Sequence, residues 1–71
     1  MTGQPAAQTA PLAAVDRAAY ATVAREVQRM ITAGAPAADV AGYLARREAS
    51  TSEGARLAAA DIIAALREVT A

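Results

Sequence analysis

Apolar residues recur along the chain at helical spacing in three successive stretches. In the first stretch they stand three or four positions apart, as Leu12, Val15, Ala19, Val23, Val27 and Met30, with Tyr20 and Ile31 widening the same side. Gly34 and Pro36 then interrupt the pattern, because glycine commonly ends a helix and proline commonly begins one. We therefore expect a first helix over residues 11–33, with Thr9 or Ala10 as its cap.

A second helix is predicted over residues 36–48, where Val40, Tyr43 and Leu44 form an apolar stripe. Another side of this helix carries only small residues, namely Ala38, Ala41, Gly42, Ala45 and Ala49. A helix side without bulk lets a second backbone approach closely, which favours a contact with a neighbour. An alanine-rich helix surface with no partner has the same pattern, so both interpretations stay open.

A third helix is predicted over residues 51–69. Ser50 and Glu53 stand three residues apart at its start, which is the pattern of a capping box. Its expected core face consists of Ala55, Ala59, Ile62, Ile63, Leu66 and Val69. Leu57 falls almost opposite this face, where it is either an ordinary exposed leucine or a contact point for a partner.

The three patterns predict an all-α fold, either a short three-helix bundle or an open helical array. Residues 1–10 offer little to bury, so we expect a disordered N-terminal tail followed by a single domain over residues 11–71. The sequence contains no apolar run of membrane length, and its N-terminus lacks the basic and apolar regions of a secretory signal. A cytoplasmic location is the corresponding expectation.

The composition also indicates a small hydrophobic core, because the domain has few large apolar side chains. Alanine is the commonest residue, and phenylalanine, tryptophan, cysteine and histidine are absent. A domain of 71 residues with few large apolar side chains lies near the limit of independent stability. Because disulfides and imidazole or thiolate metal sites are excluded, we expect association with a protein partner or with itself. The use of arginine without lysine is typical of GC-rich bacterial genomes.

Candidate chemistry is sparse. Ser50 and Ser52 have no histidine to activate them and are better explained as helix-start residues. The acidic residues form neither a metal-binding loop nor a pair on one helix face. We therefore expect no catalytic residue, cofactor or metal site. Asp16 lies within the apolar arc of the first helix, where it either adds favourable charge to the helix start or meets Tyr20 or a partner's arginine.

Nucleic-acid binding is the main alternative. The segment VAGYLA, Val40 to Ala45, resembles the first helix of a helix-turn-helix, although Arg46 and Arg47 follow where that motif has a turn glycine. These two arginines and Arg56 cluster around the predicted helix junction, either as solvated helix-end charges or as contacts to nucleic acid or an acidic partner. The net charge of zero disfavours affinity that depends on neutralising many phosphates.

The sequence thus favours a non-catalytic helical interaction module, such as a bacterial accessory subunit, an adaptor or a self-assembling protein. The predicted partner contacts are Ala38, Gly42, Ala45, Ala49 and Leu57. The alternative function is a small nucleic-acid-binding regulator that uses Arg46, Arg47 and Arg56. Neither hypothesis involves a membrane or a small-molecule substrate.

Overall fold

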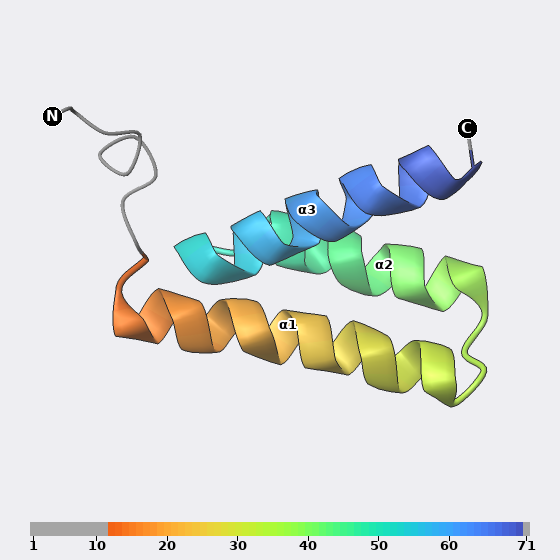
Figure 1. Ribbon diagram of the computed structural model, residues 1–71, viewed down its shortest axis with the longest axis horizontal. Coiled ribbons are helices and arrows are strands. Elements are labelled where there is room, and N and C mark those ends of the chain that lie inside the picture. The colour runs from red at the N-terminus through yellow and green to blue at the C-terminus, as the bar shows by residue number, and fades with distance from the viewer. Residues whose placement is uncertain (1–11, 71) are drawn as a thin grey trace, which may run out of the picture.

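A computed structural model describes residues 12–70, which form three α-helices packed together (Figure 1). The helices are α1 (Ala14–Thr32), α2 (Ala37–Glu48) and α3 (Glu53–Thr70). α3 packs against both other helices, and its contact with α1 is the most extensive. The predicted all-α fold of three helices is therefore confirmed, while the predicted tail at residues 1–10 lies outside the described residues. None of the helices described is long and apolar enough to cross a bilayer.

α1 begins at Ala14, later than the predicted start at residue 11. Ala13 holds the cap position in an extended conformation, with ψ of 157°, and it makes no side-chain cap hydrogen bond. Its carbonyl accepts the first helical bond from the amide of Arg17 at 2.9 Å. The cap predicted at Thr9 or Ala10 is therefore wrong, because the first turn of the helix lies further along the chain.

α1 ends at Thr32 in the motif that Gly34 predicts. Gly34 has φ of +79°, a left-handed conformation that glycine adopts without a steric penalty. The amide of Gly34 donates to the carbonyl of Ile31 at 3.0 Å, and the amide of Ala35 donates to the carbonyl of Met30 at 2.9 Å. These paired bonds are a Schellman motif, which satisfies the last carbonyls of α1 and turns the chain toward α2.

α2 runs close to its predicted bounds of 36–48. Pro36 stands at the cap position with extended backbone, ψ 148°, and the helix proper begins at Ala37. Asp39 lies in the first turn, and Arg46 and Arg47 lie in the last turn. Both placements suit the helix dipole, which favours negative charge at the start and positive charge at the end.

α3 begins at Glu53 and is capped by Ser52 rather than by Ser50. The Ser52 hydroxyl accepts a hydrogen bond from the amide of Ala55 at 3.3 Å, and the Ser50 hydroxyl accepts one from the amide of Ser52 at 3.0 Å. The third helical position is thus occupied by alanine, which cannot close a capping box. The predicted Ser50–Glu53 box is wrong, and Glu53 forms an ion pair with Arg56 instead.

α1 and α3 approach each other most closely at Gly54. The Gly54 amide donates to a carboxylate oxygen of Asp16 at 3.4 Å, so an acid of α1 helps to cap α3. A Cβ at position 54 would stand only 1.9 Å from the Asp16 carbonyl oxygen. The backbones can therefore meet here only if residue 54 is glycine. Asp16 does lie in the first turn of α1, as expected, but its second role at α3 is not evident from the sequence.

The core is small and consists mostly of short side chains. Its buried residues are Val23 and Val27 from α1, Val40 and Leu44 from α2, and Ala55, Ala58 and Ala59 from α3. Leu44 is the largest fully buried side chain, with 1% of its surface exposed. The three alanines let α3 lie close against its neighbours, but they bury little apolar area. The contribution of the hydrophobic effect therefore depends strongly on Leu44 and the valines.

A hydrogen bond between Tyr20 and Asp61 also joins α1 to α3. The Tyr20 hydroxyl donates to the Asp61 carboxylate at 2.6 Å. This bond, assisted by partial burial and by the negative charge of Asp61, raises the pKa of Tyr20 above its ordinary value of 10.0. The folded state thus holds the phenolic proton more tightly than the unfolded state does. The resulting stabilisation is complete below pH 10.0 and is lost as the pH rises through the folded-state pKa.

We predict that Tyr20→Phe removes this alkaline component of the stability profile. The variant should lose about 0.5–1 kcal/mol near neutral pH, the usual contribution of one exposed hydrogen bond. Its stability should then change less than that of the parent chain as the pH rises above about 10. Urea unfolding followed by circular dichroism at a series of pH values measures both effects. Asp61→Ala should reproduce the change, whereas a parallel alkaline decline in parent and Tyr20→Phe chains would contradict it.

Candidate functional site

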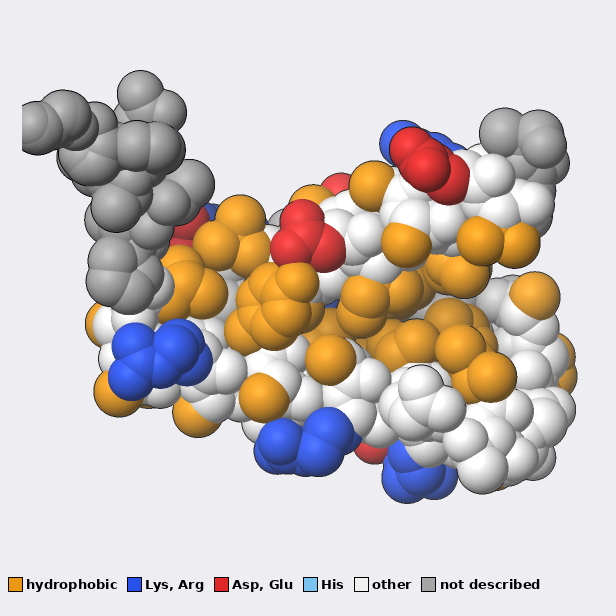
Figure 2. All heavy atoms as spheres, viewed as in Figure 1, with side chains coloured by type: hydrophobic (Ala, Val, Ile, Leu, Met, Phe, Trp, Pro, Cys, Tyr) orange, Lys and Arg blue, Asp and Glu red, His pale blue; other side chains and the backbone are white. Residues whose placement is uncertain are grey.

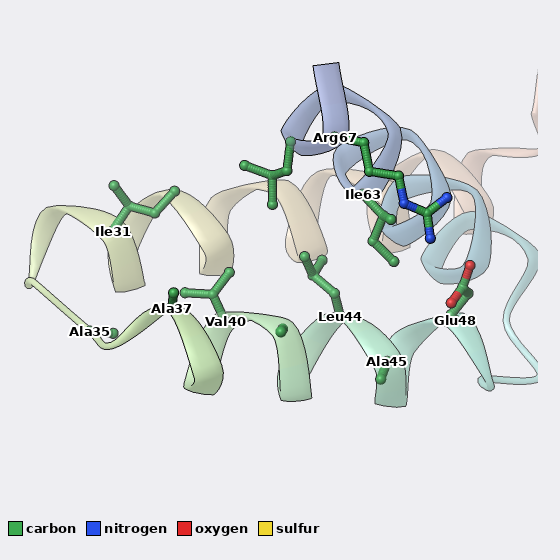
Figure 3. A pocket seen from close by; sticks show the side chains of 11 residues that line it. Ile31, Ala35, Ala37, Val40, Leu44, Ala45, Glu48, Ile63 and Arg67 are labelled. Atoms are coloured by element: carbon green, nitrogen blue, oxygen red, sulfur yellow. The ribbon is translucent and has the colours of Figure 1, made fainter. Parts of the chain in front are cut away.

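An open groove lies between α2 and the C-terminal half of α3, and we call it the α2/α3 groove (Figure 3). Its volume is about 610 Å³. It is lined by Ile31, Ala35, Ala37, Val40, Ala41, Leu44, Ala45, Glu48, Ile63, Leu66 and Arg67. All of these residues except one acid and one arginine are apolar. Figure 2 shows apolar side chains gathered beneath the C-terminal half of α3, where the surface is hollowed.

α2 provides the floor and one wall of the groove. Val40 and Leu44 are buried, and Figure 3 shows them directed toward α3. Ala37, Ala41 and Ala45 follow one another at four-residue steps, so they lie on successive turns of one side of α2. Because these side chains are single methyl groups, the wall leaves room for a bulky group or a second helix to approach the α2 backbone.

α3 provides the other wall through Ile63 and Leu66. Leu66 is 40% exposed, and Val69, one turn further, is 81% exposed. The prediction that both residues belong to the core face is therefore wrong. The buried residues of α3 lie in its first half, and Figure 1 shows the C-terminal half rising away from α1 and α2. The apolar face continues along α3, but the helices that cover it do not.

The apolar face of α1 is also incompletely covered. Val15 near its start and Ile31 near its end are both exposed, although the helical spacing predicts that they share the face of Val23 and Val27. Ile31 lines the α2/α3 groove, so its exposure extends the apolar surface of that groove onto the end of α1. Val15 lies more than four helical turns away from Ile31 along α1, beyond the reach of the groove.

The charged residues of the groove are Glu48 on α2 and Arg67 on α3. Figure 3 shows their side chains near the same end of the groove and directed toward each other from facing walls. One acid and one base give this end no net charge. A ligand with a strong charge of either sign would be attracted by one side chain and repelled by the other.

The groove has the size of a small-molecule pocket, but its polar groups stand only at one end. Pockets for small ligands are mostly apolar and carry a small number of placed polar groups that fix the orientation of the ligand. Here the polar groups are confined to Glu48 and Arg67 at one end. Within residues 12–70 there is also no group of three or more histidine, cysteine or acidic side chains that could hold a metal ion. What the groove offers is a long apolar contact surface.

Of the predicted contact residues, Ala45 is the one that lines the groove. Ala38 and Ala49 are exposed, Gly42 is half-buried, and Leu57 is 37% exposed. In helical projection Leu57 lies half a turn around α3 from Leu66, on the opposite side of the helix. The predicted residues are thus spread over different surfaces. The sequence pattern missed Ala37, Ala41 and Leu66 as a joint surface, although Ala41 belongs to the small side and Leu66 to the apolar face.

The predicted arginine cluster is divided by its local interactions. Arg56 forms an ion pair with Glu53, which offsets its charge. The guanidinium of Arg47 lies over the ring of Tyr43, 5.4 Å from the ring centre, and its Nε is buried without a hydrogen-bond partner. Arg46 is exposed at the end of α2. The three arginines therefore do not form an unopposed basic surface of the kind that dominates binding to phosphates.

A further ion pair lies on α1, where Arg29 donates to the carboxylate of Glu26. This hydrogen bond lowers the pKa of Glu26 and raises that of Arg29. Glu26 is half-buried and Arg29 is exposed, and neither residue lines the groove. The pair is a local stabilising feature of α1, worth little at an exposed site.

The α2/α3 groove is accordingly a predominantly apolar surface whose charged residues are Glu48 and Arg67. Its walls come from α2 and α3, and the end of α1 closes one side through Ile31. Comparisons of the chain with protein-family models, with curated proteins and with solved structures found no match.

Proposed function

We propose that this chain is a non-catalytic interaction module that binds an amphipathic α-helix in the α2/α3 groove. One observation carries the proposal: the C-terminal half of α3 presents large apolar residues to solvent beside a wall of alanines on α2. Large exposed apolar surfaces on small soluble domains commonly mark sites of protein interaction. The composition supports the same function, since a thin core gains stability when a partner covers this surface.

A helix fits the groove better than an extended strand does. The backbone groups of α2 and α3 are already paired within their helices, so the walls offer no free edge for a β-strand. A helix brings its own backbone bonds and needs only an apolar stripe. Ala37, Ala41 and Ala45 extend over roughly 12 Å of α2, about the length of two helical turns. The expected partner therefore presents apolar residues at i, i+3 or i+4, and i+7.

Binding to nucleic acid through Arg46, Arg47 and Arg56 has weaker support. Glu53 offsets the charge of Arg56, and Arg47 is engaged with Tyr43. That function requires affinity that falls steeply as salt concentration rises, because each neutralised phosphate releases counterions. A binding assay with duplex DNA and structured RNA at about 50 mM salt distinguishes the two functions. Tight binding that decreases with salt would favour the arginine surface over the groove.

Selection of helical peptides tests the proposed function directly. The chain is immobilised at low density, so that neighbouring copies cannot pair, and is exposed to a displayed library of amphipathic helical peptides. We expect enriched peptides with apolar residues in the i, i+3 or i+4, i+7 pattern and with little net charge. An enriched set without this pattern, or the absence of any specific enrichment, would contradict the proposal.

Two leucines of α3 provide the matched control for this selection. Leu66 is 40% exposed in the groove and Leu57 is 37% exposed on the opposite side of the same helix. Leu66→Glu places a charge in the apolar groove and should reduce peptide binding at least about tenfold, which corresponds to about 1.4 kcal/mol. Leu57→Glu adds the same charge outside the groove and should leave binding unchanged. Equal losses for both variants would indicate a different binding surface.

A further inference from the structure

We infer that the helix bound in the α2/α3 groove is α3 of a second copy of this chain, so that two copies pair about a two-fold axis. The inference rests on the proposed function, because it names the partner for the same groove. In such a pair the C-terminal half of each α3 lies in the groove of the other copy. Three features of the chain support this arrangement: the order of residue sizes along α3, the shape of the groove, and its charges.

On the side of α3 that faces the core, residue size increases from the buried first half of the helix to the exposed second half. The residues of α3 that are buried in the core, Ala55, Ala58 and Ala59, are all small. The larger residues on this side come later: Ile62 and Ile63 are partly buried against the core, and Leu66 and Val69 are left 40% and 81% exposed. Burial of large side chains contributes more than burial of alanine, so a monomer alone would gain by the opposite order. The large residues stand where a second molecule can cover them.

One copy carries both halves of a complementary surface. The ridge of Ile63, Leu66 and Val69 on α3 is bulky, whereas Ala37, Ala41 and Ala45 on α2 leave a shallow trough beside it. In a two-fold interface, residues of the first copy contact the second copy and the reverse contacts repeat the same pairs. The ridge of each copy can therefore enter the trough of the other copy. This contact buries the Leu66 side chain of both copies.

The charges of the groove also match those of a second copy. The groove carries Glu48 on the α2 wall and Arg67 on the α3 wall. A partner with a strong charge of one sign would be repelled by one of these two side chains. Glu48 and Arg67 face each other within one copy (Figure 3), and α3 of a second copy brings the same acid and base to this end, so that unlike charges can also meet across the two-fold contact. The zero net charge of the chain adds no long-range repulsion between copies. The same surface is thus attractive to itself in both shape and charge.

Sedimentation equilibrium of the full chain over a wide concentration range tests the pairing. The chain should change from 7.2 kDa to about twice that mass as its concentration rises. Leu66→Glu should keep its helical circular dichroism and shift the transition to at least about tenfold higher concentration, while Leu57→Glu should follow the parent chain. A single-chain mass at all concentrations, or a shift caused equally by Leu57→Glu, would overturn the inference.

Mixing two charge variants tests which residues face each other. Glu48→Arg makes both charged groups of the groove positive, and Arg67→Glu makes both negative. Each variant alone should pair more weakly than the parent, because the two-fold contact then brings like charges together. An equal mixture should recover pairing, since each copy supplies the charge that the other lacks. This recovery cannot come from contacts within one copy, so a mixture no better than its components would contradict the arrangement.

The failure of this inference is distinguishable from failure of the proposed function. A chain that stays monomeric but selects helical peptides through Leu66 has a functional groove with a different partner. If the chain neither pairs nor selects peptides, the proposed function and the pairing of two copies are both contradicted. Pairing that Leu66→Glu weakens and Leu57→Glu does not, together with recovery in the mixture of charge variants, supports both.

Discussion

Gly54→Ala is expected to destabilise the fold severely, although alanine is the better helix former. The added Cβ would stand 1.9 Å from the carbonyl oxygen of Asp16 and 2.7 Å from its carbonyl carbon. Both are backbone atoms of α1, so relief requires the two helices to move apart. Overpacking of this kind commonly costs about 1–3 kcal/mol, and the movement also weakens the bond from the Gly54 amide to the Asp16 carboxylate. We expect the midpoint of thermal unfolding to fall by on the order of 10 °C.

Gly42→Ala is the matched control, because it makes the same substitution in another helix without the close approach. A Cβ at position 42 would meet only the flexible side chain of Arg46, at 3.7 Å. Here alanine should raise stability by about 0.5–1 kcal/mol through its helix propensity. Thermal unfolding of both variants therefore gives shifts of opposite sign. A Gly54→Ala chain as stable as the parent would contradict the close α1/α3 packing.

Leu44→Ala is the second substitution with a large expected effect. Leu44 is 1% exposed and is the largest side chain that is fully buried among residues 12–70. Truncation of such a leucine typically costs about 2–5 kcal/mol, since the lost apolar contact is joined by the cost of a cavity. A domain of this size has a total stability of roughly 4–10 kcal/mol. We therefore expect the variant to be largely unfolded, or to unfold at a much lower urea concentration than the parent.

Leu57→Ala provides the comparison for this loss. Leu57 has the same side chain but is 37% exposed, so its truncation should cost less than about 1 kcal/mol. Urea unfolding curves followed by circular dichroism measure both values. If the two truncations were equally mild, the core would have to lie elsewhere than around Leu44.

The three helices and most of their ends follow from the sequence, because these features depend on local chemistry. Gly34 ends α1 through its left-handed backbone, and Pro36 stands directly before α2. The start of α3 was predicted less well. Ser50 and Ser52 both lie before the first turn, and the choice between them depends on where the chain bends, which the S-x-x-E pattern does not specify.

Features that depend on the arrangement of helices could not be predicted. Gly54 reads as an ordinary helical glycine until α1 is placed against it, and Asp16 reads as a helix-start charge until it meets α3. Tyr20 likewise finds its partner, Asp61, in a helix 41 residues further along the chain. These contacts join segments that are distant in the sequence. The spacing of residues within one helix does not indicate which residues of another helix they will contact.

The α2/α3 groove was missed for a related physical reason. Helical periodicity places Leu66 and Val69 on the apolar face of α3, but periodicity carries no information on how much of that face the other helices cover. The small side of α2 was recognised, yet only Ala41 and Ala45 among its residues line the groove. The contact surface expected at Ala38, Gly42, Ala49 and Leu57 stays a prediction. The Leu57→Glu variant tests it independently of the groove, because Leu57 lies outside the groove.

The most direct test of the groove as the functional site is to map, on the unmodified chain, which residues contact a binding partner. Amide chemical shifts of isotope-labelled chain can be followed by NMR as unlabelled chain is added up to about 1 mM, where even weak pairs form. We predict shifts concentrated at Ala41, Ala45 and Leu66, with little change at Leu57. Shifts concentrated instead around Leu57 or the arginines at the α2–α3 junction would contradict the groove as the functional site. No shifts at all would contradict the pairing of two copies through the groove.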